Sequence, residues 1–435
     1  MSGIRGIINE DLDSTYAEKV ALKFGNYIKG GSIALASDTR TSSTVIKSGV
    51  LSGLIQSGCT VFDLGFSSTP SVFKEVAVRN LDGGIIVTAS HNPPQWNGIK
   101  FVTKGGRGVF EDELSAIEKT ETRVTRPGKV FKRKALYTAI LRAKAGANSS
   151  PGVKVALDLA GGVGSLFITS ILHYQGCVVH SIHDTPGIFP RIIDPTVDNL
   201  STLSNVIKED ECDVGFAYDC DADRLVIVDR RGEKMSGDAT LLTCLLYFLE
   251  NSRNRSVAVS VDTSLAAEDL VREFNGKIVY SKVGESNVVR QILENNCGAG
   301  GEGSSGGYIE PSFVMCRDGV HASTMITRMI ASEGSLQAIT SNFKKYFQDR
   351  AKLEIDLKLA PRILEVLAKS SGEVDLTDGV KIRVGDKSWV LVRSSNTENV
   401  IRVSVESKSE KRSKELVQEY SSKILEIERE LSRNI

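Results

Sequence analysis

One pattern of strand, polar loop and helix occurs three times in this sequence, and it limits the fold more than any other feature. Apolar runs at residues 33–36, 153–158 and 257–262 are each followed by a polar or glycine-containing loop and then by a helical pattern. Each helical pattern gives way to a glycine and a second apolar run. Alternating strands and helices are typical of βαβ units with mostly parallel strands. The repetition predicts three α/β domains built on one plan.

The end of the sequence follows a different pattern. Strands are expected at 353–359, 380–383, 389–392 and 400–405, and a charged helix is expected at 410–431. Strands that are set apart from helices are typical of an α+β domain.

Two stretches rich in small and polar residues, at 145–152 and 251–255, suit domain boundaries. We therefore predict an α/β protein with three similar α/β mixed-sheet domains and a C-terminal α+β domain. The predicted domains are residues 1–148, 149–252, 253–350 and 351–435.

The composition argues against several classes of partner. Of the 435 residues, 41% are hydrophobic and 25% are charged, as is ordinary for a globular protein. Lys plus Arg and Asp plus Glu both total 54, so the charge balance gives no reason to expect nucleic acid or a membrane as partner. The sequence has no apolar run of membrane-spanning length and no apolar signal core at its N-terminus. The seven cysteines show neither metal-ligand spacing nor a disulfide framework. We therefore expect the protein to be located in the reducing cytoplasm.

The first repeated unit ends in a loop that carries a serine. The run 85–87 predicts a buried strand, and Ser90 follows it just before the sequence His-Asn-Pro-Pro at 91–94. The prolines prevent a strand or an ordinary helix from continuing, so the chain must turn. Open α/β sheets bind ligands at the carboxyl ends of their strands. The Ser90 hydroxyl is therefore expected where such sheets bind ligands, and a plain surface turn is the alternative.

The second unit ends on Asp219, Asp221 and Asp223, which alternate along the chain after an apolar run. Close carboxylates raise each other's pKa, and a hard divalent cation such as Mg²⁺ removes that penalty. A calcium-binding hand would need glycine and glutamate where this sequence has Arg224 and Arg230, so that interpretation fails. A solvated acidic turn is the remaining alternative.

The third unit ends on the glycine-rich loop 300–307, which contains Glu302 and Ser304. Part of this loop formally matches the G-x-S-x-G motif of serine hydrolases. That motif requires a strand before it, a helix after it, and Asp and then His later in the chain. The only later histidine is His321, so a hydrolase is not favoured. Three unusual loops at matching places suggest one shared cleft.

The loop 393–399 of the last domain has the chemistry of a phosphate site. Hydroxyl, amide and backbone N–H groups in a turn, flanked by arginine, are suited to hold a phosphate. An ordinary polar hairpin is the alternative. The glycine turn 161–164 is a weak signal for a dinucleotide, because Phe167 stands where the fingerprint needs its third glycine.

Four motifs, taken together and in this order, resemble the α-D-phosphohexomutase family of phosphoglucomutase, phosphomannomutase and phosphoglucosamine mutase. Shorter supporting matches include Ile4-Arg5-Gly6 and Asn97-Gly98-Ile99-Lys100. The four motifs are Thr88-Ala89-Ser90-His91-Asn92-Pro93, Asp219-x-Asp221-x-Asp223-Arg224, Gly301-Glu302-x-Ser304 and Arg393-x-Ser395-x-Thr397-Glu398.

The resemblance implies a phosphosugar mutase, which is an isomerase, with four domains around a central cleft. Phospho-Ser90 would give its phosphoryl group to the free hydroxyl of a hexose phosphate. The resulting hexose 1,6-bisphosphate would turn over in the cleft and return its other phosphoryl group to Ser90. The expected cofactors are one Mg²⁺ per chain and hexose 1,6-bisphosphate as activator and intermediate. The expected partners are small hexose phosphates, and we expect a monomer or a homodimer.

The implied site has four groups of residues. Around Ser90, positive charge would come from Arg5, Lys100 and Arg224, and either His91 or Lys100 would carry the proton. The metal would be held by Asp219, Asp221 and Asp223 together with Ser90. The sugar would contact Glu302 and Ser304. The non-reacting phosphate would bind Arg393, Ser395, Asn396, Thr397 and Arg402.

The sequence also departs from the family pattern. Cys220 stands where glycine is common, which suggests backbone strain or redox sensitivity there. Gly306 stands where many members have histidine, and Ser286 where a basic residue is frequent. These changes leave the choice among glucosamine, mannose and glucose phosphates open. A non-catalytic sugar-phosphate binding protein on the same frame is the alternative function.

Overall fold

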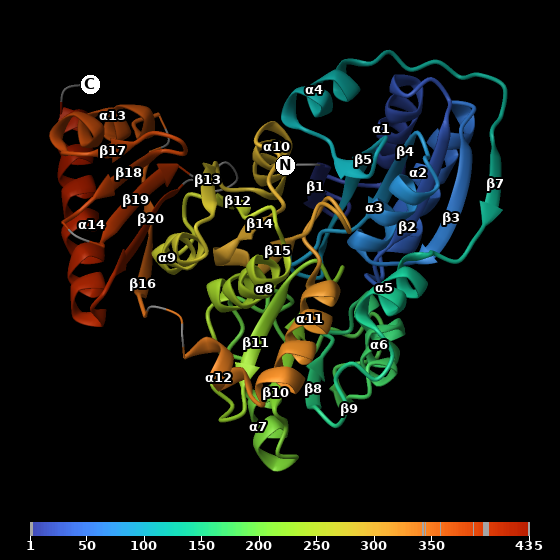
Figure 1. The fold of residues 1–435 in the computed structure, drawn as a ribbon. Helices are drawn as coiled ribbons and strands as arrows, with labels where there is room; N and C mark the ends of the chain where they lie inside the picture. The colour runs from blue at the N-terminus through green and yellow to red at the C-terminus, as the bar shows by residue number, and fades with distance from the viewer. Residues whose placement is uncertain are drawn as a thin grey trace.

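The computed structural model describes residues 3–341, 343, 345–356, 358–385, 387–394 and 400–433. In these residues the strands form four sheets that follow one another along the chain, and helices pack against each sheet (Figure 1). None of the described helices is long and apolar enough to cross a membrane.

The first sheet has the strand order β1-β5-β4-β2-β3-β7, and β6 pairs with β5. Residues alternate between its faces, so Ile33 and Leu35 pack on one side and Ala34 and Ala36 on the other. The strands are β1 (Gly3–Ile7), β2 (Ser32–Ser37), β3 (Thr60–Phe66), β4 (Gly83–Val87), β5 (Trp96–Thr103), β6 (Arg107–Gly108) and β7 (Lys129–Lys132). The helices are α1 (Ser14–Tyr27), α2 (Ser43–Gln56), α3 (Thr69–Val78), α4 (Glu111–Lys119) and α5 (Tyr137–Ala145).

The second and third sheets share one strand order, β9-β8-β10-β11 in the second and β13-β12-β14-β15 in the third. In each, the strand that follows the central parallel pair returns antiparallel, as β11 does to β10 and β15 does to β14. The strands are β8 (Lys154–Asp158), β9 (Val178–Ile182), β10 (Val214–Tyr218), β11 (Leu225–Asp229), β12 (Ser256–Ser260), β13 (Lys277–Ser281), β14 (Ala299–Glu302) and β15 (Gly307–Ile309). The helices are η1 (Val163–Leu166), α6 (Ile168–Tyr174), α7 (Ser201–Glu209), α8 (Gly237–Asn251), α9 (Leu265–Glu273), α10 (Glu285–Glu294), η2 (Gly303–Ser305), α11 (Gly319–Glu333) and α12 (Leu336–Thr340).

Strands β3-β2-β4-β5 of the first sheet repeat this same order, again with an antiparallel return from β4 to β5. The predicted plan of three similar mixed-sheet domains is therefore confirmed. The repeat has a direct consequence for the site. The loops that carry Ser90, the three aspartates and Glu302 occupy equivalent hairpins, between β4 and β5, β10 and β11, and β14 and β15.

The last sheet is antiparallel, in the order β16-β20-β19-β18-β17, which confirms the predicted α+β domain. Its strands are β16 (Phe347–Glu354), β17 (Val374–Asp375), β18 (Val380–Arg383), β19 (Trp389–Ser394) and β20 (Val400–Ser407). Its helices are α13 (Ala360–Ser370) and α14 (Glu410–Arg433).

The strand expected at 353–359 was placed too late in the sequence. The observed strand, β16, ends at Glu354 because its register is set by eight pairs with β20, from Phe347–Ser407 to Glu354–Val400. Residue 359 is already the N-cap of α13. The strand β16 also spans the predicted boundary at 350/351. The three boundaries between the four domains stay a prediction.

The core is divided unequally among the four domains. One continuous cluster of buried side chains joins the first three sheets, with members such as Ile86, Leu157 and Val257. The last domain has its own cluster between its sheet and α13 and α14. A small cluster of Val261, Trp389 and Leu391 connects it to the third sheet.

Candidate active site

The equivalent hairpins bring residues of all four domains to one cleft of about 1600 Å³, which confirms the predicted central cleft. Ser90, Asp219, Asp221 and Asp223 are fully buried beside it. Residues that line the cleft include Arg5, His91, Lys100, Asp194, Arg224, Glu302, Ser304, Arg317, Arg393 and Arg402.

Ser90 is held in a left-handed conformation with φ of 55°. A non-glycine residue in this region costs on the order of 1–3 kcal/mol, so the surrounding structure must impose it. The Ser90 backbone N–H donates to Thr88 Oγ1 at 2.9 Å, and the Ser90 hydroxyl donates to Asp219 Oδ2 at 2.8 Å. The turn therefore aims the hydroxyl at the aspartate loop.

The buried Arg40 fixes the shape of this turn. Its guanidinium donates to the backbone carbonyls of Ser90, Asn92 and Pro93 at 2.7, 2.6 and 2.7 Å. Asp38 balances its charge through a 3.1 Å ion pair, and Asp38 also accepts from the Thr88 hydroxyl. Arg40 thus gives a donor to the Ser90 and Asn92 carbonyls of this tight turn, whereas the Pro93 carbonyl also accepts from the Trp96 N–H at 3.0 Å.

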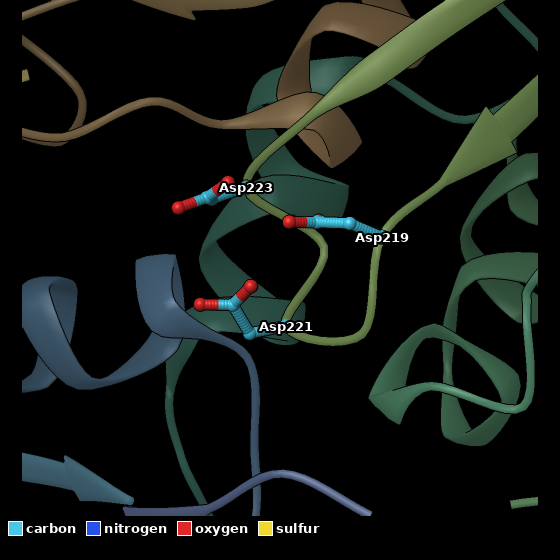
Figure 2. Close-up of side chains that lie close together, drawn as sticks. All are labelled: Asp219, Asp221 and Asp223. Carbon is cyan, nitrogen blue, oxygen red and sulfur yellow. The ribbon is translucent and has the colours of Figure 1, made fainter. Parts of the chain in front are cut away.

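Asp219, Asp221 and Asp223 converge on one side of the loop between β10 and β11 (Figure 2). One oxygen from each lies within 4.8 Å of the others. Asp221 Oδ1 and Asp223 Oδ1 are buried and have no hydrogen-bond partner among the described residues. Buried carboxylate oxygens that converge without partners are the ligands that a hard cation such as Mg²⁺ prefers. These three residues therefore fit a divalent metal.

The pKa values within the triad split in opposite directions. Burial raises the pKa of Asp219, and the neighbouring charges of Asp223 and Asp221 raise it further. Burial would also raise the pKa of Asp223, but Arg317 and Lys100 outweigh it and hold that pKa low. The split is the expected result of like charges confined together, and a cation would relieve it.

Positive side chains surround Ser90 and the triad. Lys100 Nζ contacts Asp221 Oδ2 at 2.7 Å and Asp223 Oδ2 at 3.2 Å. Arg224 pairs with Asp194 at 3.1 Å, and Arg5 donates to Asn92 Oδ1 at 2.9 Å.

His91 is the neutral member of this group. His91 Nδ1 lies 3.4 Å from Ser90 Oγ, and Nε2 lies 3.4 Å from Arg224 Nη2. Burial lowers the pKa of His91, and Arg224 and Arg5 lower it further. Because Arg224 can only donate, Nε2 is the accepting nitrogen, and the neutral ring carries its proton on Nδ1, which faces Ser90 Oγ.

In the third hairpin, Glu302 and Ser304 reach the cleft. Glu302 Oε1 accepts from the Gly284 N–H at 2.7 Å, and Oε2 accepts from Arg317 Nη1 at 3.2 Å. The loop continues through a short 3₁₀ turn into β15, so the helix that a serine-hydrolase motif needs does not follow. Gly306 has φ of +65°, and a Cβ there would lie 2.3 Å from Leu225 O, which explains why a larger residue is not accommodated at this position.

Arg317 is a cleft residue that sequence reasoning missed. Its guanidinium contacts Asp223 Oδ2 at 3.0 Å, Glu285 Oε2 at 3.1 Å and Glu302 Oε2 at 3.2 Å. It therefore joins the loop of the three aspartates, residues 219–223, to the loop of Glu302 and Ser304, residues 300–307. We call the first the metal loop and the second the sugar loop, after the roles that the family resemblance implies. A Cβ on Gly307 would lie 2.2 Å from Arg317 Cδ, so the glycine makes room for the side chain. Arg317 belongs to no motif, so the sequence offered no signal for it.

The last domain contributes Arg393 and Arg402 to the cleft. They lie directly opposite each other in the pairing of β19 with β20. Arg393 Nη1 donates to Asp378 Oδ2 at 3.1 Å. The other three residues predicted for this phosphate site lie outside the described residues; they are Ser395, Asn396 and Thr397.

The backbone strain expected at Cys220 is not found there. The positive φ in this loop belongs to Ala222, at 58°, and Cys220 has an ordinary backbone conformation. The Cys220 thiol is fully buried, with Sγ 3.8 Å from Thr39 Oγ1. Burial raises the pKa of this thiol, which disfavours the reactive thiolate and argues against redox sensitivity.

Models of the phosphoglucomutase/phosphomannomutase family match the chain in four successive segments. The α/β/α domains I, II and III match residues 1–126, 135–232 and 236–346, and the C-terminal domain matches residues 347–422.

The chain is similar over almost its whole length to curated relatives. It is 34% identical over 434 residues to a probable phosphoglucosamine mutase of Methanopyrus kandleri, which covers 96% of each chain. It is 33% identical over 446 residues to a phosphoglucomutase/phosphomannomutase of Thermococcus kodakarensis, which covers 98% of this chain and 97% of the relative. A solved phosphoglucomutase/phosphomannomutase family protein from Burkholderia thailandensis has the same fold, with a TM-score of 0.88 at 24% identity and coverage of 98% and 96%.

The chain belongs to the α-D-phosphohexomutase family. It is a phosphosugar mutase, an isomerase that acts by intramolecular phosphoryl transfer.

Proposed function

We propose that this protein interconverts hexose 1-phosphates and hexose 6-phosphates through a phosphorylated Ser90. The observation that carries the proposal is the 2.8 Å hydrogen bond from the Ser90 hydroxyl to Asp219, within a buried triad suited to a metal. A serine is a weak nucleophile and needs such an environment to take part in phosphoryl transfer. The paired arginines Arg393 and Arg402 stand at another wall of the same cleft, where they suit the phosphate that does not react.

The proposed reaction has two transfers. Phospho-Ser90 gives its phosphoryl group to the free hydroxyl of a hexose monophosphate, and that hydroxyl loses its proton to a base. The product, hexose 1,6-bisphosphate, turns round in the cleft and returns its other phosphoryl group to the Ser90 oxygen. Asp219, Asp221 and Asp223 would hold one Mg²⁺, which would supply positive charge next to the group in transfer. The bisphosphate also serves as the activator that phosphorylates the free enzyme.

We propose either His91 or Lys100 as the residue that carries this proton. His91 Nδ1 lies 3.4 Å from Ser90 Oγ, whereas the Lys100 ammonium is occupied by Asp221 and Asp223. We assign Lys100, Arg5 and Arg224 to stabilising negative charge on the phosphoryl group. Glu302 and Ser304 are assigned to the sugar hydroxyls, and the phosphate assignment of Ser395, Asn396 and Thr397 stays a prediction.

The substrate is proposed to be glucosamine phosphate, or mannose and glucose phosphates, in line with the names of the two curated relatives. We propose a cytoplasmic monomer or homodimer, a compartment consistent with the seven cysteines, all within the described residues and all free. A non-catalytic sugar-phosphate binding protein is not favoured, because binding alone would need neither Ser90 nor the buried triad.

The test is a Mg²⁺-dependent mutase assay on the 1-phosphates of glucosamine, mannose and glucose, primed with a trace of hexose 1,6-bisphosphate. Ser90→Ala should abolish turnover, and Ser115→Ala, a cleft-wall serine on α4, should leave it unchanged. Turnover that survives in Ser90→Ala would contradict the assignment of Ser90 as the residue that carries the phosphoryl group. Binding without turnover in the wild type would favour the non-catalytic alternative.

A further inference from the structure

Two carboxylates from different domains hold neighbouring backbone N–H groups just before α10. The Val283 N–H donates to Asp378 Oδ2 at 3.0 Å, and the Gly284 N–H donates to Glu302 Oε1 at 2.7 Å. Asp378 belongs to the last domain and Glu302 to the sugar loop. Gly284 has φ of +122°, a conformation that favours glycine, so the turn presents both N–H groups in a fixed direction.

Asp378 also accepts from the arginine assigned to the phosphate. Its Oδ2 lies 3.1 Å from Arg393 Nη1, and the two side chains are 21% and 23% exposed. Both residues line the cleft. One carboxylate oxygen thus contacts the third domain and Arg393 together.

These contacts continue into the metal loop. Arg317 joins Asp223 to Glu302 through ion pairs of 3.0 and 3.2 Å, and Glu302 in turn holds Gly284, the neighbour of Val283. A chain of polar contacts therefore connects the triad to the last domain. Asp378 is the point at which this chain enters that domain.

We propose that Asp378 is a positioning residue for the mutase reaction. It docks the last domain on the Val283–Gly284 turn beside Glu302, and it holds the Arg393 guanidinium toward the cleft. The proposal rests on the proposed function for the role of Arg393. The docking contact stands independently of that role.

The arrangement suits an arginine that must bind phosphate. A guanidinium has five N–H donors, and the contact with Asp378 uses one of them. The ion pair restrains a long side chain before substrate arrives, which reduces the entropy lost on binding. Asp378 also places a negative charge near the phosphate, but its pairing with Arg393 reduces that repulsion. The positioning effect should therefore outweigh the repulsion.

The chain offers a matched control contact between the same two domains. Lys387 Nζ pairs with Asp269 on α9 at 2.6 Å, and neither residue lines the cleft. Lys387→Met removes an ion pair from the interface without touching Arg393. It separates general loosening of the last domain from loss of arginine positioning.

Kinetics give the first test. Asp378→Ala should raise KM for the hexose phosphate about tenfold, the usual effect of losing one charge-assisted contact, while kcat changes by less than about threefold. Lys387→Met should change both values by less than about twofold. An unchanged or lower KM in Asp378→Ala would overturn the proposal, and so would an equal rise of KM in Lys387→Met.

Hydrogen exchange of the substrate-free protein gives a second test that needs no activity. Asp378→Ala should speed exchange of the Val283 amide, measured by mass spectrometry on a peptide that begins at least three residues before Val283. Asp378→Asn keeps an acceptor for this N–H and should restore slow exchange, while its KM stays raised because the ion pair that restrains Arg393 is lost. Unchanged exchange in Asp378→Ala would contradict the docking contact.

The two proposals can fail separately. If the wild type turns over no hexose phosphate, calorimetric binding of hexose 6-phosphate replaces KM as the measurement. Weaker binding together with faster exchange in Asp378→Ala would then support the positioning role while the mutase assignment fails. Equal binding in wild type and variant would overturn the positioning role.

Discussion

The metal loop and the last domain are held in place by different means. Ser90 and the triad are fully buried, and the loops that carry them pack on a core shared by three domains. The last domain has a separate core and meets the third sheet through a small apolar cluster and a few polar contacts, among them those of Asp378 and Lys387.

The difference matches the two tasks in the proposed reaction. Phosphoryl transfer requires the nucleophile and the charges to hold one geometry within tenths of an ångström, which a continuous core provides. A bisphosphate that turns round requires space, and a domain held by few contacts can move to give it. The predictions below test whether the first region is as rigid, and the second as independent, as these contacts indicate.

Neutralising one member of the triad should have the largest effect. Asp223→Asn removes a proposed metal ligand and the partner of Arg317 and Lys100. We expect kcat to fall by at least about 10²-fold, since this charge acts directly on the transferring group. Calorimetric titration with Mg²⁺ should also show weaker binding.

Asp229→Asn, at the exposed end of the same hairpin, is the control for this experiment and should keep activity and Mg²⁺ affinity. Chelation of Mg²⁺ should reproduce the loss in the wild type. Full activity of Asp223→Asn without metal would contradict the metal assignment.

Loss of Arg40 should be the next largest effect. Arg40→Ala leaves Asp38 buried without its partner and two carbonyls of the Ser90 turn without their donor. Removing one member of a buried ion pair costs about 3–5 kcal/mol, and we expect a loss of that size in the free energy of unfolding measured with urea. Arg123→Ala, an exposed arginine of the same domain whose partner Glu121 is also exposed, should cost less than about 1 kcal/mol. Equal losses in both variants would mean that the Ser90 turn does not depend on Arg40.

A smaller, pH-dependent effect is expected at Glu310, which joins the α5 and α11 helices of the shared core. Glu310 contacts Lys144 at 2.8 Å and His321 at 2.9 Å. Burial would raise the pKa of Glu310, but His321 and Lys144 outweigh it and lower the pKa to about 2. A lowered carboxyl pKa stabilises the fold above the unfolded value of about 4.5, and this contribution is lost as pH falls toward 2.

Glu310→Gln should therefore reduce the free energy of unfolding by about 1–3 kcal/mol at pH 7 and by less at pH 3. Urea unfolding at both pH values measures the difference. A loss that is the same at both pH values would show that packing, and not ionisation, stabilises this contact.

Most of the architecture could be predicted because it follows from local patterns of apolar and polar residues along the sequence. The threefold alternation of strands and helices predicted three similar domains, and the loops of Ser90, the aspartates and Glu302 could be found from residue types that suit their chemistry. The sequence placed the strand 353–359 wrongly because its bounds depend on pairing with β20, a distant segment.

The residues that sequence analysis missed act across domains. Arg317 and Asp378 each belong to no motif, and their importance follows only from the partners that the fold brings to them. Strain was expected at Cys220 and is found at Ala222, because the loop's turn depends on contacts beyond its own sequence.

The central claim is that Ser90 carries the phosphoryl group. The most direct test is peptide mass spectrometry of the protein after incubation with hexose 1,6-bisphosphate and Mg²⁺, with Ser90→Ala treated in the same way. The account predicts one phosphoryl group on the peptide that contains Ser90, removed when excess hexose monophosphate is added. Absence of phosphate on this peptide in an enzyme that turns over, or phosphate on another serine, would contradict it.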